Sequence, residues 1–158
     1  MVILPADQST LIAMLDVKSI GTIIFCENSG TTYDFSKIQK RAADAGKNLE
    51  ILIWKGNSNS QRFGKGYGEG EQIEHAINNS QYLPDHVNFY KLTGRNFVQD
   101  FENICVTLAE RQNVFKIPAW IENTAETRFY KANVLFYKKH LIRSYTETVS
   151  LSTYFMMN

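Results

Sequence analysis

The sequence predicts an α/β fold, in which a mainly parallel β-sheet carries helices on both of its faces. Three observations predict it. Short apolar runs recur along the chain, segments with helical spacing of apolar residues separate them, and small polar residues follow the runs. Strands that alternate with helices in this way are typical of parallel βαβ units. We expect one domain over residues 1–158, because this length buries a sizeable core and the chain shows no internal repeat or linker.

Apolar runs predict the strands of the sheet. Residues 22–26 combine apolar and β-branched residues, as a strand buried on both faces does. The other expected strands are residues 49–54, 87–92, 114–120 and 127–131. In such a sheet, the core should include the side chains of Ile23, Phe25, Ile51, Ile53 and Phe89.

Capping residues and helical spacing predict the helices. Asp34 and Asn133 each precede a segment with apolar residues at helical spacing, so we expect both to act as N-caps. The expected helices cover residues 9–19, 35–45, 71–80, 97–108 and 134–145. Residues 55–70, which are rich in glycine, serine and asparagine, are expected to form a loop.

Composition excludes several classes of protein. The formal net charge is +1, so nothing in the overall charge predicts a nucleic-acid partner. No apolar run approaches the roughly 18 residues that span a bilayer, and no secretory signal is evident at the start of the sequence. Cys26 and Cys105 both lie in apolar runs, which favours buried free thiols. We therefore expect a cytoplasmic protein.

Glycine-rich residues 64–70 are the most distinctive stretch of the sequence. Four of the nine glycines occur here, at every second position, and helical spacing follows from Glu71. Unpaired N–H groups at a helix N-terminus favour an anion such as a phosphate, and glycine lets the backbone approach a ligand closely. The spacing matches neither standard phosphate-binding motif. Glu69 and Glu71 add negative charge, which suits sugar hydroxyls, a metal or general-base chemistry. The alternative is a flexible surface loop before an ordinary helix.

Polar residues follow three of the expected strands and should meet at one edge of a parallel sheet, where ligands bind in open α/β folds. The expected nucleotide- or substrate-binding residues are Glu27, Asn28, Ser29, Lys65, Gly66, Gly68, Lys91, Thr93, Gly94, Arg95 and Arg128. Arg95 carries most weight, because its planar donor fork suits a diphosphate or a carboxylate. The alternative for Arg95 is a surface arginine at a strand end. Arg128 either reaches the same edge or, as we expect more, pairs with an acidic residue.

Other polar residues of the sequence do not predict a specific site. Four basic side chains, Lys138, Lys139, His140 and Arg143, predict a solvated helix face, with membrane-surface contact as the less favoured alternative. The three histidines show no metal-ligand spacing with the cysteines, and no nucleophile motif occurs.

Four short segments resemble a known family. Residues 25–30, 64–71, 89–95 and 126–131 read FCENSG, GKGYGEGE, FYKLTGR and ETRFYK, in that order. Together they resemble nucleotide-sugar glycosyltransferases of the GT-A type, from bacterial polysaccharide and lipopolysaccharide gene clusters. The resemblance spans about residues 10–145 and implies a Rossmann-like nucleotide-diphospho-sugar transferase architecture. It also implies a nucleotide-sugar donor and a glycan or lipid-linked acceptor.

Two features depart from that family. GT-A folds usually open with a strand whose end contacts the nucleotide. Only residues 1–5 precede the first expected helix, so we expect that strand to be shortened or missing. In the last segment, Glu126 stands where the family resemblance implies an aspartate, and residues 151–154 lack an acidic residue that it also implies. A truncated or degenerate member of the family would show such departures.

The resulting hypothesis is a protein that transfers a sugar from a nucleotide-sugar donor in bacterial surface polysaccharide synthesis. Glu69 or Glu71 would be the catalytic base or a contact to sugar hydroxyls. The alternatives are a non-catalytic nucleotide-sugar or glycan-binding remnant, a subunit of a larger assembly, and, more weakly, a protein for another phosphorylated metabolite. Many GT-A enzymes hold a divalent metal with an Asp-x-Asp pair, which this sequence lacks. A cationic strand end at Lys91 to Arg95 can neutralise a diphosphate instead, so we expect no cofactor and metal-independent binding.

Overall fold

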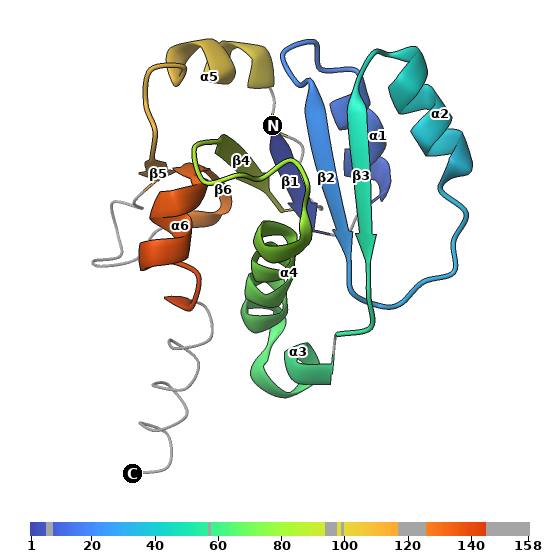
Figure 1. Cartoon of the computed structure of the whole chain (residues 1–158), viewed down its shortest axis with the longest axis vertical. Helices are drawn as coiled ribbons and strands as arrows, with labels where there is room; N and C mark the ends of the chain where they lie inside the picture. Colours follow the sequence, from blue (N-terminus) through green and yellow to red (C-terminus); the bar gives the residue numbers. More distant parts are fainter. Residues whose placement is uncertain (6–7, 57, 94–97, 99, 117–125, 145–158) are drawn as a thin grey trace.

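One mixed six-stranded sheet forms the centre of the computed structural model, which describes residues 1–5, 8–56, 58–93, 98, 100–116 and 126–144 (Figure 1). The strands are β1 Val2–Pro5, β2 Thr22–Glu27, β3 Asn48–Ile53, β4 Asn88–Leu92, β5 Val114–Lys116 and β6 Glu126–Asn133. Their order across the sheet is β3-β2-β1-β4-β6-β5. The first four strands in this order are parallel, and β6 and β5 add to them in antiparallel pairing. The prediction of a mainly parallel α/β sheet is therefore confirmed, and its arrangement is compatible with a Rossmann-like fold.

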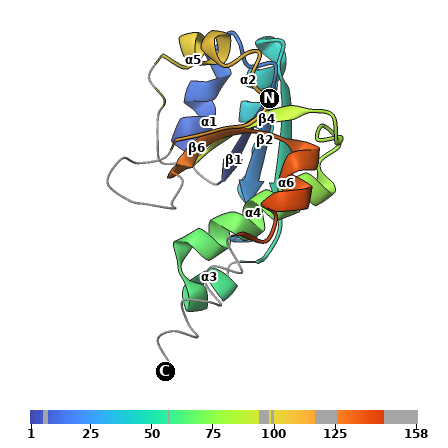
Figure 2. The same ribbon diagram turned by 90° about the vertical axis from the view of Figure 1, so that its left-hand side faces the viewer.

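Helices cover both faces of this sheet, as predicted (Figures 1 and 2). They are α1 Gln8–Leu15, α2 Ser36–Asp44, α3 Ser58–Phe63, α4 Lys65–Asn79, α5 Phe101–Thr107 and α6 Val134–His140. Side chains from α1, α2 and α5 share one hydrophobic core with the sheet, and side chains from α4 and α6 share the other. None of the described helices has the length and apolar character that crossing a membrane requires.

Strand β2 shows why an apolar run predicts a buried strand. Its side chains alternate between the two cores, with Ile23 and Phe25 in one and Ile24 and Cys26 in the other. All four are almost completely buried. An inner strand with helices over both faces needs apolar residues at every position.

Strand β3 departs from that expectation. Ile51 is only half-buried, and Ile53 is 41% exposed, so the prediction that Ile53 is buried was wrong. The reason is position, because β3 is the outermost strand on its side of the sheet and has one strand neighbour instead of two.

The first residues of the chain decide between a shortened and a missing opening strand. Val2–Pro5 forms β1, which pairs with both β2 and β4 in the middle of the sheet. The side chains of Val2 and Ile3 are fully buried. The opening strand is therefore present, although it is only four residues long.

The glycine-rich stretch is helical, so the prediction of a loop over residues 55–70 was wrong for most of its length. Residues 58–63 form α3, and α4 begins at Lys65 after an N-cap at Gly64 with φ of +93°. A Cβ at Gly68 would lie 2.5 Å from the Cβ of Ser60, so glycine at this position lets α3 pack directly on α4. Tertiary packing here overrides the low helix propensity of glycine.

Other boundaries agree with the sequence to within a few residues. Asn133 is the N-cap of α6, and its side chain accepts a hydrogen bond from the Phe136 N–H at 3.2 Å. Asp34 accepts a hydrogen bond from the Ser36 N–H at 2.9 Å, one residue before the N-cap of α2. Helix α5 begins at Phe101 and α6 ends at His140, so both are shorter than predicted. Residues 117–120 of the predicted fourth strand lie outside the described residues.

Candidate functional site at the carboxyl edge of the sheet

Four parallel strands end at the same edge of the sheet, which is the candidate site. The strands β1, β2, β3 and β4 end at Pro5, Glu27, Ile53 and Leu92. Helix α4 starts beyond this edge and runs back over the sheet, and α3 lies below the arrowheads of β1 to β3 in Figure 1. The carboxyl edge of a parallel sheet is where open α/β folds bind ligands.

A buried polar cluster lies where β4 reaches this edge, and we call it the Lys91 junction. It consists of the side chains of Lys91, Glu69 and Thr93 and the main-chain carbonyl of Thr127. The ammonium group of Lys91 lies 2.7 Å from Glu69 Oε1 and donates hydrogen bonds to Thr93 Oγ1 at 2.8 Å and to the Thr127 carbonyl. Thr93 Oγ1 in turn donates to Glu69 Oε1 at 2.6 Å. The junction therefore ties α4 to the ends of β4 and β6.

Burial makes these contacts strong constraints. The side chain of Lys91 is fully buried, and that of Glu69 is 15% exposed. A buried ammonium group requires a nearby negative charge and acceptors for its hydrogen atoms, and Glu69, Thr93 and the Thr127 carbonyl supply them. The centroid of the Tyr130 ring lies 5.8 Å from Lys91 Nζ. Close by, Tyr137 packs on Tyr130, and burial raises the pKa of Tyr137 above its usual value.

The chain leaving β4 is also held through its backbone. The Thr93 N–H donates to the Arg128 carbonyl at 2.8 Å, so Thr93 is held through both its main chain and its side chain. The Arg128 side chain is exposed on β6, at the same end of the sheet. Gly94 and Arg95, which the sequence analysis places next along the chain, lie outside the described residues.

The polar residues after β2 form a separate part of the edge. Glu27 Oε1 accepts a hydrogen bond from the Ser29 N–H at 2.8 Å. The Asn28 carbonyl accepts from the Gly56 N–H at 3.0 Å, and Ser29 pairs with Lys55 in an isolated antiparallel bridge. These residues are therefore folded against the segment that follows β3. The structure places them at the predicted edge, on the β2–β3 side of it.

The two predicted carboxylates point in different directions. Residues two apart on an α-helix are separated by roughly 200° around its axis. Glu69 faces β4 and the Lys91 junction, whereas Glu71 faces α3, where its Oε1 accepts a hydrogen bond from Asn59 Nδ2 at 2.9 Å. The Oε2 atom of Glu71 is buried and has no hydrogen-bond partner among the described residues. Glu69 and Glu71 therefore do not form one paired site.

The remaining predicted residues lie at the start of α4. Lys65 and Gly66 are exposed in its first turn, and Gly68 is buried against α3. Here the N-terminus of α4 is capped by a glycine without a side-chain hydrogen bond. Positive charge at this end comes from Lys65 and from Arg62 at the end of α3.

An aromatic stack beside α4 was not predicted from the sequence. The rings of Trp54, just after β3, and His75, on α4, stack with centroids 3.8 Å apart and an interplanar angle of 15°. Burial lowers the pKa of His75 below its usual value, because it disfavours the charged imidazolium. Nothing in the spacing of Trp54 and His75 indicates this contact, which depends on α4 packing over the end of β3.

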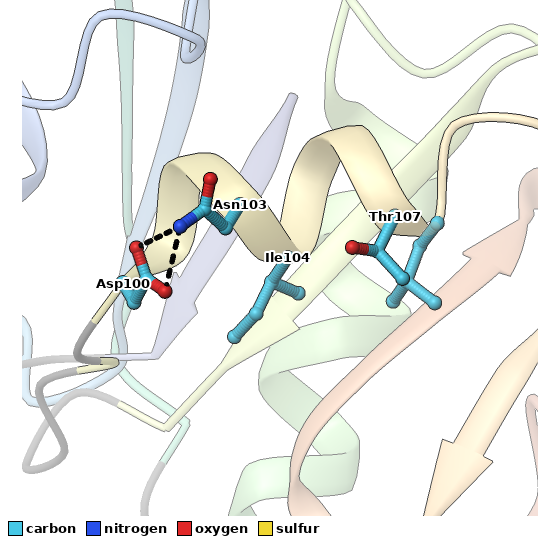
Figure 3. Close-up of a pocket in the computed structure, with 5 residues that line it drawn as sticks. Asp100, Asn103, Ile104 and Thr107 are labelled. Carbon is cyan, nitrogen blue, oxygen red and sulfur yellow. Dashed lines mark hydrogen bonds between the residues drawn. The ribbon is translucent and has the colours of Figure 1, made fainter.

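Two other surfaces lie away from the edge. A cavity of about 370 Å³ on α5 is lined by Asp100, Asn103, Ile104, Thr107 and Leu108, and Asn103 donates a hydrogen bond to the Asp100 carboxylate (Figure 3). Helix α5 lies at the opposite, amino end of the strands (Figure 1). On α6, Lys138 pairs with Asp85 at 2.7 Å and Lys139 and His140 are exposed, and Arg143 is exposed just beyond the helix. Across the described residues, no three histidine, cysteine or acidic side chains form a group suited to a metal ion.

Comparison with protein-family models, curated proteins and solved structures found no match for this chain. What is established is an α/β protein with a mostly parallel sheet. The family resemblance rests on the four segments of the sequence.

Proposed function

We propose that this protein is a glycosyltransferase-like protein that binds a nucleotide-sugar at the carboxyl edge of its sheet. In this proposal it transfers the sugar during bacterial surface polysaccharide synthesis. One observation carries the proposal, namely that three of the four segments with family resemblance meet at the Lys91 junction. Residues 64–71 contribute Glu69, residues 89–95 contribute Lys91 and Thr93, and residues 126–131 contribute the Thr127 carbonyl. Segments far apart in the sequence thus share one place in the fold.

The junction supports this function by fixing the end of β4, which precedes Gly94 and Arg95 in the sequence. Thr93 is the last described residue before Gly94 and Arg95, and both its hydroxyl and its N–H are held. A ligand-binding group works best when the residues beneath it are already in position. We propose that Arg95 binds the diphosphate, with Lys65 and Arg128 adding positive charge at the same edge. Glu69 compensates the charge of Lys91, so Lys91 adds no net charge to that site.

Metal-free binding is part of the proposal. A guanidinium fork can neutralise diphosphate charge and form two parallel hydrogen bonds to it. It would also repel a cation placed beside it. We therefore propose that nucleotide affinity does not depend on a divalent metal and that no cofactor is needed. The acceptor in this proposal is a glycan or a lipid-linked acceptor, and the basic side chains of α6 offer a surface for peripheral membrane contact.

A second candidate is a non-catalytic nucleotide-sugar or glycan-binding protein, alone or as a subunit of a larger assembly. The engagement of both carboxylates favours it. Glu69 is held by Lys91 and Thr93, and Glu71 by Asn59. A general base must come within hydrogen-bond reach of the acceptor hydroxyl. Glu69 would have to leave its present partners, and the unpartnered Oε2 of Glu71 is buried, so neither carboxylate reaches an acceptor without moving its side chain. In the enzyme proposal, Glu71 exchanges Asn59 for the acceptor or for a sugar hydroxyl.

Thermal-shift measurements with nucleoside diphosphates and nucleotide-sugars test the binding step. A ligand at about 100 times its dissociation constant should stabilise the chain by about 2.7 kcal/mol. Arg95→Ala should weaken binding by about 1.5–3 kcal/mol, the range for charged hydrogen bonds. Arg111→Ala, which changes an exposed arginine beyond α5, is the matched control and should leave affinity unchanged. Excess chelator should also leave affinity unchanged.

The outcomes separate the two candidates. Release of free nucleoside diphosphate together with glycosylated acceptor supports transfer, whereas binding without turnover on any acceptor supports the non-catalytic candidate. If no nucleotide or nucleotide-sugar stabilises the chain, both are wrong. A loss of affinity of tenfold or more on chelation, which is about 1.4 kcal/mol, would show that the metal-free part of the proposal is wrong.

A further inference from the structure

The free edge of β3 is built differently from the other edge of the sheet. Strand β5, at the far edge, is described over Val114–Lys116, where its register with β6 shifts between Phe115 and Lys116 and the Lys116 side chain is exposed. A bulge and a lysine are devices that prevent a sheet edge from pairing with another chain. The six residues of β3 are Asn-Leu-Glu-Ile-Leu-Ile, without lysine or proline, and pair with β2 in continuous register.

The single charged residue of β3 does not protect this edge. Glu50 accepts a hydrogen bond from the Ser80 hydroxyl, and its other oxygen accepts from the Gln81 N–H at 3.2 Å. Its carboxylate is therefore turned onto the α4 side of the sheet. The apolar side chains of Leu49, Ile51 and Ile53 lie on the other side, and Ile53 is 41% exposed.

The hydrogen bonds to β2 show which backbone groups of β3 face outward. The N–H groups of Asn48 and Trp54 donate to Gly21 and Glu27, so even-numbered residues of β3 face β2. Alternation along a strand then turns the N–H and C=O groups of Leu49, Ile51 and Ile53 to the free edge. In the described part of the chain, no strand pairs with this edge.

We infer that the free edge of β3 binds β3 of a second copy of this chain, in antiparallel pairing about a two-fold axis at Ile51. In that register Ile51 lies opposite Ile51 of the partner subunit, and Leu49 lies opposite the partner's Ile53. Residues that face each other in such pairs exchange both backbone hydrogen bonds, so every outward-facing group of both strands is satisfied. The result is one continuous sheet across the two copies.

Charge and packing select this register over its neighbours. A shift of the axis to Glu50 would place two carboxylates directly opposite each other, which is destabilising. A shift to Leu52 would leave Leu49 of each copy without a partner. Pairing about Ile51 instead places Glu50 beside the partner's Leu52 and covers Ile53 with the partner's Leu49. This pairing would also explain why β3, an edge strand, is as apolar as a strand inside a sheet.

Helix α2 lies next to β3 in Figure 1, shares the hydrophobic core on the Leu49 and Ile51 side of the sheet, and would approach α2 of the partner subunit. Two of the three cations of α2 are compensated within one copy. Lys40 pairs with Asp44 at 2.7 Å and Arg41 pairs with Asp16 at 2.8 Å, whereas the third cation, Lys37, is exposed. A closed pair with an isologous interface, and not an open chain of copies, is what a two-fold axis requires.

Sedimentation velocity over a range of concentrations tests the pairing, with Ile53→Lys as the disrupting variant. Lysine is tolerated at a residue that is 41% exposed, and it protects sheet edges. We expect the native chain to dimerise and Ile53→Lys to weaken dimerisation at least tenfold. Ile12→Lys makes the same change at a residue on α1 that is 37% exposed, and it should leave the dimer intact.

Amide hydrogen exchange measured by NMR tests the register. The N–H groups of Leu49, Ile51 and Ile53 should be protected in the dimer and exchange rapidly at dilution. Those of Glu50 and Leu52 should be protected in both states, because they face β2. A native chain that stays monomeric at every soluble concentration overturns the proposal. A dimer that Ile53→Lys leaves unchanged, open-ended growth, or unprotected odd-numbered amides in the dimer would also overturn it.

Discussion

Replacing Glu69 by glutamine would keep the shape of its side chain but remove the negative charge that faces the Lys91 ammonium group. Lys91 is fully buried, and its nitrogen lies 2.7 Å from Glu69 Oε1. Removing one partner of a buried ion pair costs about 3–5 kcal/mol, because the other charge stays buried without compensation. Glu69→Gln should fall in this range. This is a large part of the ~5–15 kcal/mol by which domains are typically stable.

Removing the other partner, Lys91, should lower the free energy of unfolding by less. Lys91→Met removes the buried cation, and Glu69, which is 15% exposed, keeps some water and the hydrogen bond from Thr93. We expect about 1–3 kcal/mol for this variant, the usual range for leaving one polar group poorly satisfied. This difference between Glu69→Gln and Lys91→Met follows from burial alone, since both variants break the same contact.

Urea denaturation provides the measurement, and a surface pair provides the control. Lys40 and Asp44 on α2 are also 2.7 Å apart, but their side chains are 75% and 64% exposed. Asp44→Asn should therefore change the free energy of unfolding by only about 0.3–0.5 kcal/mol. The midpoint should shift for Glu69→Gln without a change in m, since the folded state keeps its surface. If Glu69→Gln destabilises the chain no more than Asp44→Asn, the junction does not act as a buried ion pair.

Two further predictions concern α4. Gly68→Ala should destabilise the chain by about 1–3 kcal/mol through overpacking against Ser60, whereas Gly66→Ala, where a Cβ meets nothing within 4 Å, should stabilise it by about 0.5–1 kcal/mol. Equal effects of the two changes in a denaturation series would contradict the packing of α3 on α4. The pKa of His75 should lie below its usual value of 6.5, because burial disfavours the charged imidazolium. The neutral ring therefore contributes its full stabilisation above pH 6.5. This contribution is lost as the pH falls from 6.5 to the lower pKa of the folded state. An NMR titration that places the His75 pKa above 6.5 would show that the stacked, partly buried environment is wrong.

The sequence predicted those parts of the fold whose burial is uniform. Strand β2 is apolar at nearly every position because both of its faces are covered, and alternating strands and helices indicated the parallel sheet. The same apolar pattern misled the prediction for β3. Hydrophobicity shows that Ile53 belongs in an apolar environment, but it does not say whether that environment lies within one copy of the chain.

The glycine-rich stretch was misjudged for a different reason. Glycine at every second position lowers helix propensity, so local sequence favoured a loop. The packing of α3 on α4 at Gly68 decides otherwise, and that contact depends on tertiary structure. Lys91 and Thr93 were placed at the correct strand end from the sequence. Their acidic partner could not be chosen between Glu69 and Glu71 without knowing that this stretch is helical.

Helix α4 thus decides how the two carboxylates divide their roles. Had residues 64–70 formed a loop, Glu69 and Glu71 could both have faced one ligand. On a helix they point roughly 200° apart, and only Glu69 reaches the buried ammonium group of Lys91. Its charge is required there whatever the site binds, because Lys91 would otherwise be uncompensated. Glu69 therefore positions the strand end that precedes Gly94 and Arg95, and under the proposed function Glu71 is the carboxylate whose role would distinguish transfer from simple binding.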